Sequence, residues 1–225
     1  MGRLIRRMIQ RKWNGNTQRD AIRLDSQTPP QGVEVWEGLP YEEDGHPMHT
    51  LNLYRPAGVS GPLPTVVDIH GGGWMYGDRQ LNRNYCMYLA SRGYAVMGMS
   101  YRLVPEVTVA GQVQDVFASL HWRAEHSTEY GFDLSRVLLT GDSAGGHLTG
   151  LTACVQLSPD LQKLYQVDPL PFSFSALAIA HGVCDVYRFR LFTPLLDLSL
   201  IHISTPHREA VVPHRRASPR RGSSL

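Results

Sequence analysis

The hydrophobic and polar positions of the chain follow two alternating periods. Short apolar runs rich in β-branched residues predict strands, and stretches with apolar residues on one helical face predict helices. The first two predicted strands flank the turn-forming pair Asp44-Gly45, which favours an antiparallel pairing. Strands are predicted at residues 33–36, 50–54, 64–69, 94–99, 136–140 and 172–180, and helices at residues 81–90, 113–125 and 146–157.

This alternation predicts an α/β fold, with a mostly parallel sheet that is covered by helices on both faces. In such sheets the catalytic loops lie at the carboxyl ends of the strands. Two glycine-rich segments of this chain directly follow predicted strands.

The first glycine-rich segment is GDSAGG at residues 141–146, between a predicted strand and a predicted helix. It fits the G-x-S-x-G pattern in the strand–turn–helix context where a nucleophilic serine is found. The tight turn requires small residues at Gly141 and Gly145, so that Ser143 projects its hydroxyl into the site. The backbone N–H of Ala144, at the start of the helix, would face the reacting carbonyl.

The second segment is HGGGW at residues 70–74, directly after the predicted strand 64–69. Gly71, Gly72 and Gly73 expose backbone N–H groups without side-chain obstruction, as an oxyanion hole requires. A phosphate-binding loop would have a GxxxxGK[ST] or GxGxxG pattern, and neither is present. The two segments together therefore favour nucleophilic catalysis over a plain flexible turn.

These segments resemble those of an α/β-hydrolase of the hormone-sensitive-lipase-like group of carboxylesterases and lipases. The similarity covers about residues 33–187 and is most specific at the two glycine-rich motifs. The matching segments are HGGGW (70–74), SYRLVPE (100–106), QDVFASLHW (114–122) and FDLSRVLLTGDSAGGHL (132–148).

The resemblance implies that Ser143 is the nucleophile, within an elbow formed with Gly141, Asp142 and Gly145. It implies an oxyanion hole from the glycines of residues 71–73, chiefly Gly72 and Gly73, together with Ala144. It assigns His70 a structural role in positioning these glycines. The implied substrates are small carboxylic esters, and neither a cofactor nor a metal is expected.

The segment SYRLVPE has its own interpretation. Pro105 would end the preceding strand, and Arg102 and Glu106 are expected to lock the loop as an ion pair. Structural support is favoured over catalysis for these residues.

A serine nucleophile needs a general base and an orienting acid, and in this fold they follow the serine in the order acid, then histidine. Two further strand–helix units would need about 60 residues, whereas 45 remain after residue 180. His147 is expected to be a helix-surface or core residue rather than the base. The acid and the base of the triad are therefore not identified. The other candidates in sequence order lack a strand-then-loop context: Asp185, Asp197, His202, His207 and His214.

These observations divide the chain into three regions. Residues 1–32 are expected to form a basic extension or cap segment, and residues 33–187 a hydrolase core that is incomplete at its C-terminal side. Residues 188–225 are rich in Arg, Pro and Ser and are predicted to be a non-native or disordered tail. As written, the chain is expected to be nearly inactive.

Charge supports the same division. The formal net charge of +2 combines an acidic middle with basic ends, where residues 1–19 carry six basic and no acidic groups. A charge run is usually a solvated arm, so no nucleic-acid partner is expected. No apolar run of membrane-spanning length occurs, and the basic start lacks the apolar region of a signal peptide.

Cys86, Cys154 and Cys184 are too few for a disulfide framework and are expected to be free core thiols in a reducing, cytoplasmic location. Two alternatives to an ester hydrolase stay open at this stage. One is an amidase or peptidase with the same machinery, and the other is a non-catalytic binding protein on a hydrolase scaffold. The sequence does not indicate an oligomeric state.

Overall fold

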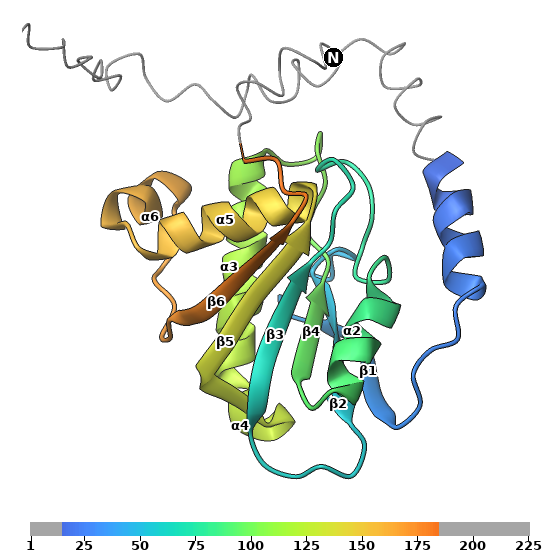
Figure 1. The fold of residues 1–225 in the computed structure, drawn as a ribbon. Coiled ribbons are helices and arrows are strands. Elements are labelled where there is room, and N and C mark those ends of the chain that lie inside the picture. Colours follow the sequence, from blue (N-terminus) through green and yellow to red (C-terminus); the bar gives the residue numbers. More distant parts are fainter. Residues whose placement is uncertain (1–14, 185–225) are drawn as a thin grey trace, which may run out of the picture.

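The computed structural model describes residues 15–184, so the first part of the basic extension, the tail 188–225 and the triad candidates after residue 184 lie outside the described residues. Residues 15–25 are helical and precede the sheet (Figure 1). The strands are β1 (Val33–Pro40), β2 (Thr50–Pro56), β3 (Leu63–Ile69), β4 (Ala95–Met99), β5 (Phe132–Asp142) and β6 (Phe174–Ala180). The helices are α2 (Arg83–Ser91), α3 (Val109–Glu125), α4 (Ser127–Tyr130), α5 (Ala144–Gln156) and α6 (Pro159–Tyr165).

The six strands form one mixed sheet in the order β1-β2-β4-β3-β5-β6. The pairs β1–β2 and β2–β4 are antiparallel, whereas β4, β3, β5 and β6 run parallel to one another. The predicted antiparallel start and the mostly parallel sheet are thus confirmed. Because β3 and β5 are neighbours, the two glycine-rich segments that follow them leave the sheet side by side.

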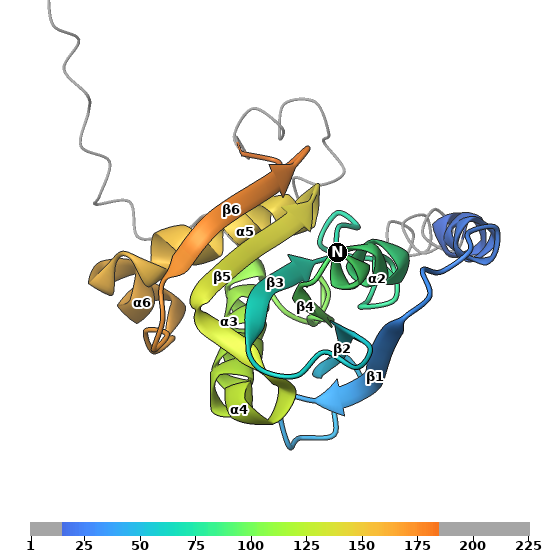
Figure 2. The ribbon, with the colours of Figure 1, turned by 60° about the horizontal axis from the view of Figure 1, so that its bottom comes forward.

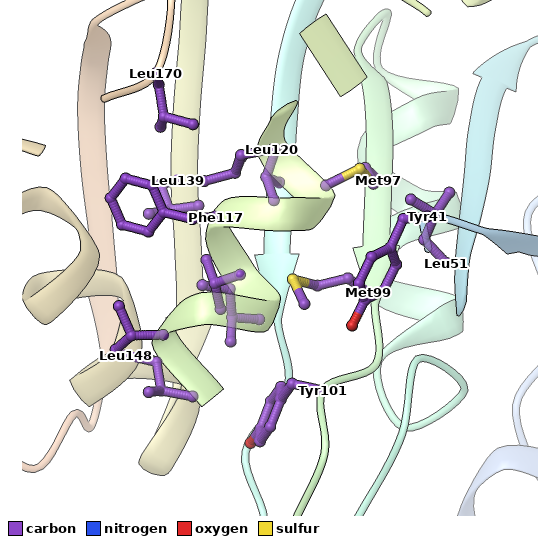
Figure 3. Close-up of a cluster of buried hydrophobic side chains, with 14 of the residues drawn as sticks. Tyr41, Leu51, Met97, Met99, Tyr101, Phe117, Leu120, Leu139, Leu148 and Leu170 are labelled. Carbon is purple, nitrogen blue, oxygen red and sulfur yellow. The ribbon is translucent and has the colours of Figure 1, made fainter. Parts of the chain in front are cut away.

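Helices cover both faces of the sheet, as predicted (Figures 1 and 2). Successive residues of each strand point to opposite faces, and the two buried clusters follow this alternation. Val66 and Val96 pack with Cys86 and Met87 of α2 on one face. On the other face, Phe117 and Leu120 of α3 meet residues of the central strands, with Leu148 of α5 in the same cluster; Met97, Met99 and Leu139 represent the sheet in Figure 3.

Helix α3 begins at Val109, four residues before the predicted start. Thr108 has an extended backbone and precedes a fully buried valine, so the helix starts at its apolar contact. Strand β5 is longer than predicted because its first residues, from Phe132 on, also pair with β3.

The predicted ion pair between Arg102 and Glu106 is wrong. The Arg102 side chain instead pairs with Asp115 of α3, and the Arg102 backbone N–H also donates to that carboxylate at 2.8 Å. Glu106 lies 2.7 Å from the His46 ring. Asp115 is buried, so its carboxylate gains more from a cation than the exposed Glu106 does, and the pairing joins this loop to α3 rather than closing it on itself.

The expectation of three core thiols is also wrong for two of them. Cys86 is buried under α2, whereas Cys154 and Cys184 are exposed. Strand β6, which is apolar as predicted, exposes Leu177 and Ile179, and within residues 15–184 only β5 pairs with it. No helix in this range is long and apolar enough to cross a membrane.

Candidate active site

Ser143 forms a strained turn between β5 and α5. Its backbone has φ of 50° and ψ of −114°, a conformation that non-glycine residues rarely adopt. A Cβ at Gly141 would lie 2.7 Å from the Ile69 carbonyl oxygen, and one at Gly145 would overlap that oxygen. Only glycines therefore allow α5 to start this close to β3. The turn is fixed further by the Ser143 N–H, which donates to the Ala180 carbonyl at 2.9 Å.

The glycine loop after β3 is tied to this turn. The Gly71 N–H donates to Asp142 Oδ1 at 3.0 Å, so the residue before Ser143 holds the loop. Gly72 and Gly73 have φ of 116° and 60°, and a Cβ at Gly72 would overlap the Tyr76 carbonyl. Position 72 therefore requires glycine, and the N–H groups of both residues belong to a loop that lies against the Ser143 turn.

Ala144 is fully buried at the first position of α5. The first N–H groups of a helix have no acceptor within the helix. The first helical bond here runs from the His147 N–H to the Ser143 carbonyl at 3.1 Å. The Ala144 N–H thus lies next to Ser143 at the positive end of the helix dipole, which suits a developing negative charge.

His70 is buried at the start of the glycine loop. Its Nδ1 lies 2.7 Å from the Gly71 carbonyl, and its ring stacks on Tyr101 with the centroids 4.2 Å apart. The Tyr101 hydroxyl donates to the His70 carbonyl at 2.8 Å. Burial lowers the pKa of His70, so the ring is neutral at neutral pH. These contacts support the structural role expected for His70.

A buried polar network lies beneath the loop. The Asn82 side-chain amide donates both to Asp68 Oδ2 at 3.1 Å and to Asp142 Oδ1 at 2.9 Å. Burial raises the pKa of Asp68 to about 7, because desolvation disfavours its charged form. Asn82 could not be identified from the sequence, since nothing in its local pattern marks it as a link between two motifs.

We expect Asp68→Asn to stabilise the fold at pH 8 by about 1–2 kcal/mol. The folded-state pKa of Asp68 lies above the unfolded value of 3.8, so the wild type loses stability as pH rises from about 4 to about 7. Urea unfolding at several pH values checks this. The variant should show a flatter pH profile over this range, and an equally steep profile would contradict the assignment.

Trp74 closes the loop on the other side. Its ring is buried, and its indole N–H points at His147 Nδ1 over 3.3 Å. Its carbonyl accepts from the Val104 N–H at 2.9 Å and from the Gln112 side chain at 2.8 Å. His147 is therefore partly buried against the loop, as expected of a residue on this helix, and its Nδ1 already contacts the Trp74 indole N–H.

Within residues 15–184, the Ser143 hydroxyl has no hydrogen bond to a histidine or a carboxylate side chain, and no group of three residues could hold a metal ion. The described site thus brings the Ser143 turn and backbone N–H donors together, and none of residues 15–184 is placed to act as a general base for the serine. The triad candidates from Asp185 to His214 lie outside the described residues.

A protein-family model described as BD-FAE matches residues 51–193 of the chain. The carboxylic ester hydrolase LipN of Mycobacterium tuberculosis is 38% identical over 120 residues, which are 52% of this chain and 31% of that protein. Carboxylesterase NlhH of the same organism is 36% identical over 140 residues, which are 60% of this chain and 42% of that protein. The chain spans less than half the length of the first curated relatives it matches.

Solved structures of esterases are also similar to this chain. Esterase B from Lactobacillus rhamnosis is 46% identical with a TM-score of 0.84, and the match covers 89% of this chain and 65% of that one. Brefeldin A esterase, a bacterial homologue of human hormone-sensitive lipase, has a TM-score of 0.60 at 24% identity, over 87% of this chain and 54% of that one.

Proposed function

Since the chain belongs to the BD-FAE family and is similar to carboxylesterases of the α/β-hydrolase fold, we propose that it cleaves carboxylic esters through an acyl-enzyme on Ser143. One observation carries the proposal. Ser143 is held at positive φ between Gly141 and Gly145, and the glycine loop is hydrogen-bonded to the adjacent Asp142.

In the proposed reaction the ester carbonyl lies over Ser143, with its oxygen directed at the N–H groups of Gly72, Gly73 and Ala144. Attack by Oγ forms the new C–O bond, and the negative charge moves to the carbonyl oxygen, where these donors stabilise it. The alcohol then leaves with a proton, and water releases the acid and regenerates the serine.

The proton of the Ser143 hydroxyl must pass to a general base. Residues 15–184 provide no base in contact with the serine, and the slow reaction of this chain stays a prediction from the sequence. In a serine hydrolase, removal of the base lowers turnover by roughly 10⁴-fold or more, and the oxyanion donors alone retain a residual rate.

The substrates are proposed to be small-molecule esters. Relatives include the carboxylesterase NlhH and a versiconal hemiacetal acetate esterase, and esterase B was solved in a form inhibited by a tributyrin phosphonate. Short-chain acyl esters are therefore the first class to test. The cytoplasmic location and the absence of a nucleic-acid partner stay predictions from the sequence.

A tributyrin-derived phosphonate is expected to modify the chain once, at Ser143. The phosphorus forms a bond to Oγ as its leaving group departs, so intact-mass and peptide mass spectrometry identify the residue. Ser143→Ala should abolish both this adduct and the slow release of p-nitrophenol from p-nitrophenyl acetate. Ser60→Ala, in the exposed loop between β2 and β3, is the matched control and should behave like the wild type.

A second candidate is a non-catalytic binding protein on the same hydrolase scaffold, because no base contacts Ser143 within residues 15–184. It predicts that the phosphonate binds without a covalent bond. Equal hydrolysis by the wild type and Ser143→Ala would contradict the proposed acyl-enzyme.

A further inference from the structure

The oxyanion glycines lie between two attachments to the nucleophile's own turn. Gly72 and Gly73 are flanked by Gly71, which is hydrogen-bonded to Asp142, and by Trp74, which contacts His147. Asp142 directly precedes Ser143, and His147 follows it by about one helical turn. The segment that must aim its N–H groups at the reacting oxygen is thus held from both sides.

The second attachment consists of two contacts. The indole N–H of Trp74 donates to His147 Nδ1 over 3.3 Å, and the two rings meet edge to face at 84° with centroids 5.5 Å apart. Burial lowers the pKa of His147, which favours the neutral ring, and the indole N–H aimed at Nδ1 assigns the ring proton to Nε2.

Trp74 itself has little freedom to move away. It is 2% exposed, and its backbone has φ of 63°, a conformation that costs free energy and persists only where the surrounding structure imposes it. Its carbonyl is held by the Val104 N–H and by the Gln112 side chain, from the loop before α3 and from α3 itself. The loop is thereby connected to two helices, and His147 is its contact on α5.

We propose that His147 is a positioning residue, which holds the glycine loop against the nucleophile helix by accepting the Trp74 indole N–H. The inference rests on the proposed ester hydrolysis for its catalytic meaning. Donors in an oxyanion hole act only when they lie within hydrogen-bond distance of the developing charge, and small displacements are costly. Loss of the acceptor should therefore loosen the loop and weaken the reaction of Ser143.

The test compares three variants. His147→Leu removes the acceptor, His147→Asn replaces Nδ1 with an amide oxygen that can accept, and Trp74→Phe removes the donor while keeping a ring. Cys154→Ser, at an exposed position on the same helix, is the control. Thermal unfolding identifies any variant that fails to fold.

Hydrogen exchange at two backbone amides measures how firmly the loop is held, and it requires no reaction at Ser143. The Met75 N–H donates to the Gly72 carbonyl at 3.2 Å, and the Val104 N–H donates to the Trp74 carbonyl at 2.9 Å. In His147→Leu and in Trp74→Phe, hydrogen exchange at these amides, followed by NMR, should accelerate about 10-fold or more relative to the control. In His147→Asn it should stay within about 2-fold of the wild type.

The rate of phosphonate labelling at Ser143 should fall by about 10-fold in His147→Leu and recover in His147→Asn. The double variant Trp74→Phe/His147→Leu should lose no more than either single variant, because both remove one interaction. Wild-type exchange at Met75 and Val104 in both single variants would overturn the positioning role. A wild-type chain that is never labelled would instead refute the proposed function, and exchange would still decide the role of His147.

Discussion

Gly145→Ala is expected to abolish phosphonate labelling of Ser143 and to lower the free energy of unfolding by about 3–5 kcal/mol. A Cβ at this position would overlap the Ile69 carbonyl oxygen and lie 2.6 Å from the His70 carbonyl oxygen. Both atoms are backbone atoms at the end of β3, so no side-chain rotation relieves the overlap. Helix α5 would have to move away from the strand, and Ser143 and the Ala144 N–H would move with it.

Gly150→Ala is the matched control for this variant. It places a methyl group on the same helix, 3.4 Å from the Ile179 side chain, which is an ordinary van der Waals contact. Alanine also favours a helix interior over glycine, so stability should stay unchanged or rise by up to about 1 kcal/mol. Urea unfolding measures both variants, and intact-mass labelling follows Ser143. A Gly145→Ala protein with wild-type stability and labelling would show that the close approach of α5 to β3 is not needed.

The sequence predicted those parts of the site that depend on neighbours along the chain. The turn around Ser143 needs glycines two residues before and two residues after it, and this spacing is visible in any sequence. The alternation of buried strands and amphipathic helices likewise predicted the mostly parallel sheet, because strand and helix periods are local properties.

Contacts between distant segments were not predictable in this way. Trp74 and His147 are 73 positions apart, and the sequence around either residue does not predict their contact. The same reason explains the wrong ion pair. Arg102 was paired with Glu106 because they are close in sequence, whereas the buried Asp115 on α3 faces Arg102 in the fold.

Arg123 is a further feature that the sequence pattern concealed. It lies in the last turn of α3, where a basic residue normally interacts with the helix dipole and solvent. In the structure its side chain is fully buried, and within residues 15–184 none of its three guanidinium nitrogens has a hydrogen-bond partner. The guanidinium lies between the rings of Phe132 and Phe172, at 5.2 and 5.1 Å from their centroids.

This environment makes the charge costly. Burial lowers the pKa of Arg123 to about 9, because the charged form loses its hydration. Contacts with two aromatic faces return only part of this cost, about 1–2 kcal/mol for a desolvated cation. An unpaired buried charge is among the few features whose removal by an apolar residue of similar volume is expected to stabilise a fold.

Arg123→Met is therefore expected to raise the free energy of unfolding by about 2–4 kcal/mol at pH 7 and the Tm by about 5–10 °C. Methionine fills the same space between the two rings without a charge. Arg123→Lys keeps the charge and should show no such gain.

The pH dependence of stability gives an independent check, because the folded-state pKa of Arg123 lies below its unfolded value of 12.5. The unfolded wild type then binds more protons above about pH 9, so its stability should rise with pH relative to Arg123→Met. Scanning calorimetry at pH 7 and 10 measures both effects, and a methionine variant less stable than the wild type would show that the guanidinium is satisfied in the folded protein.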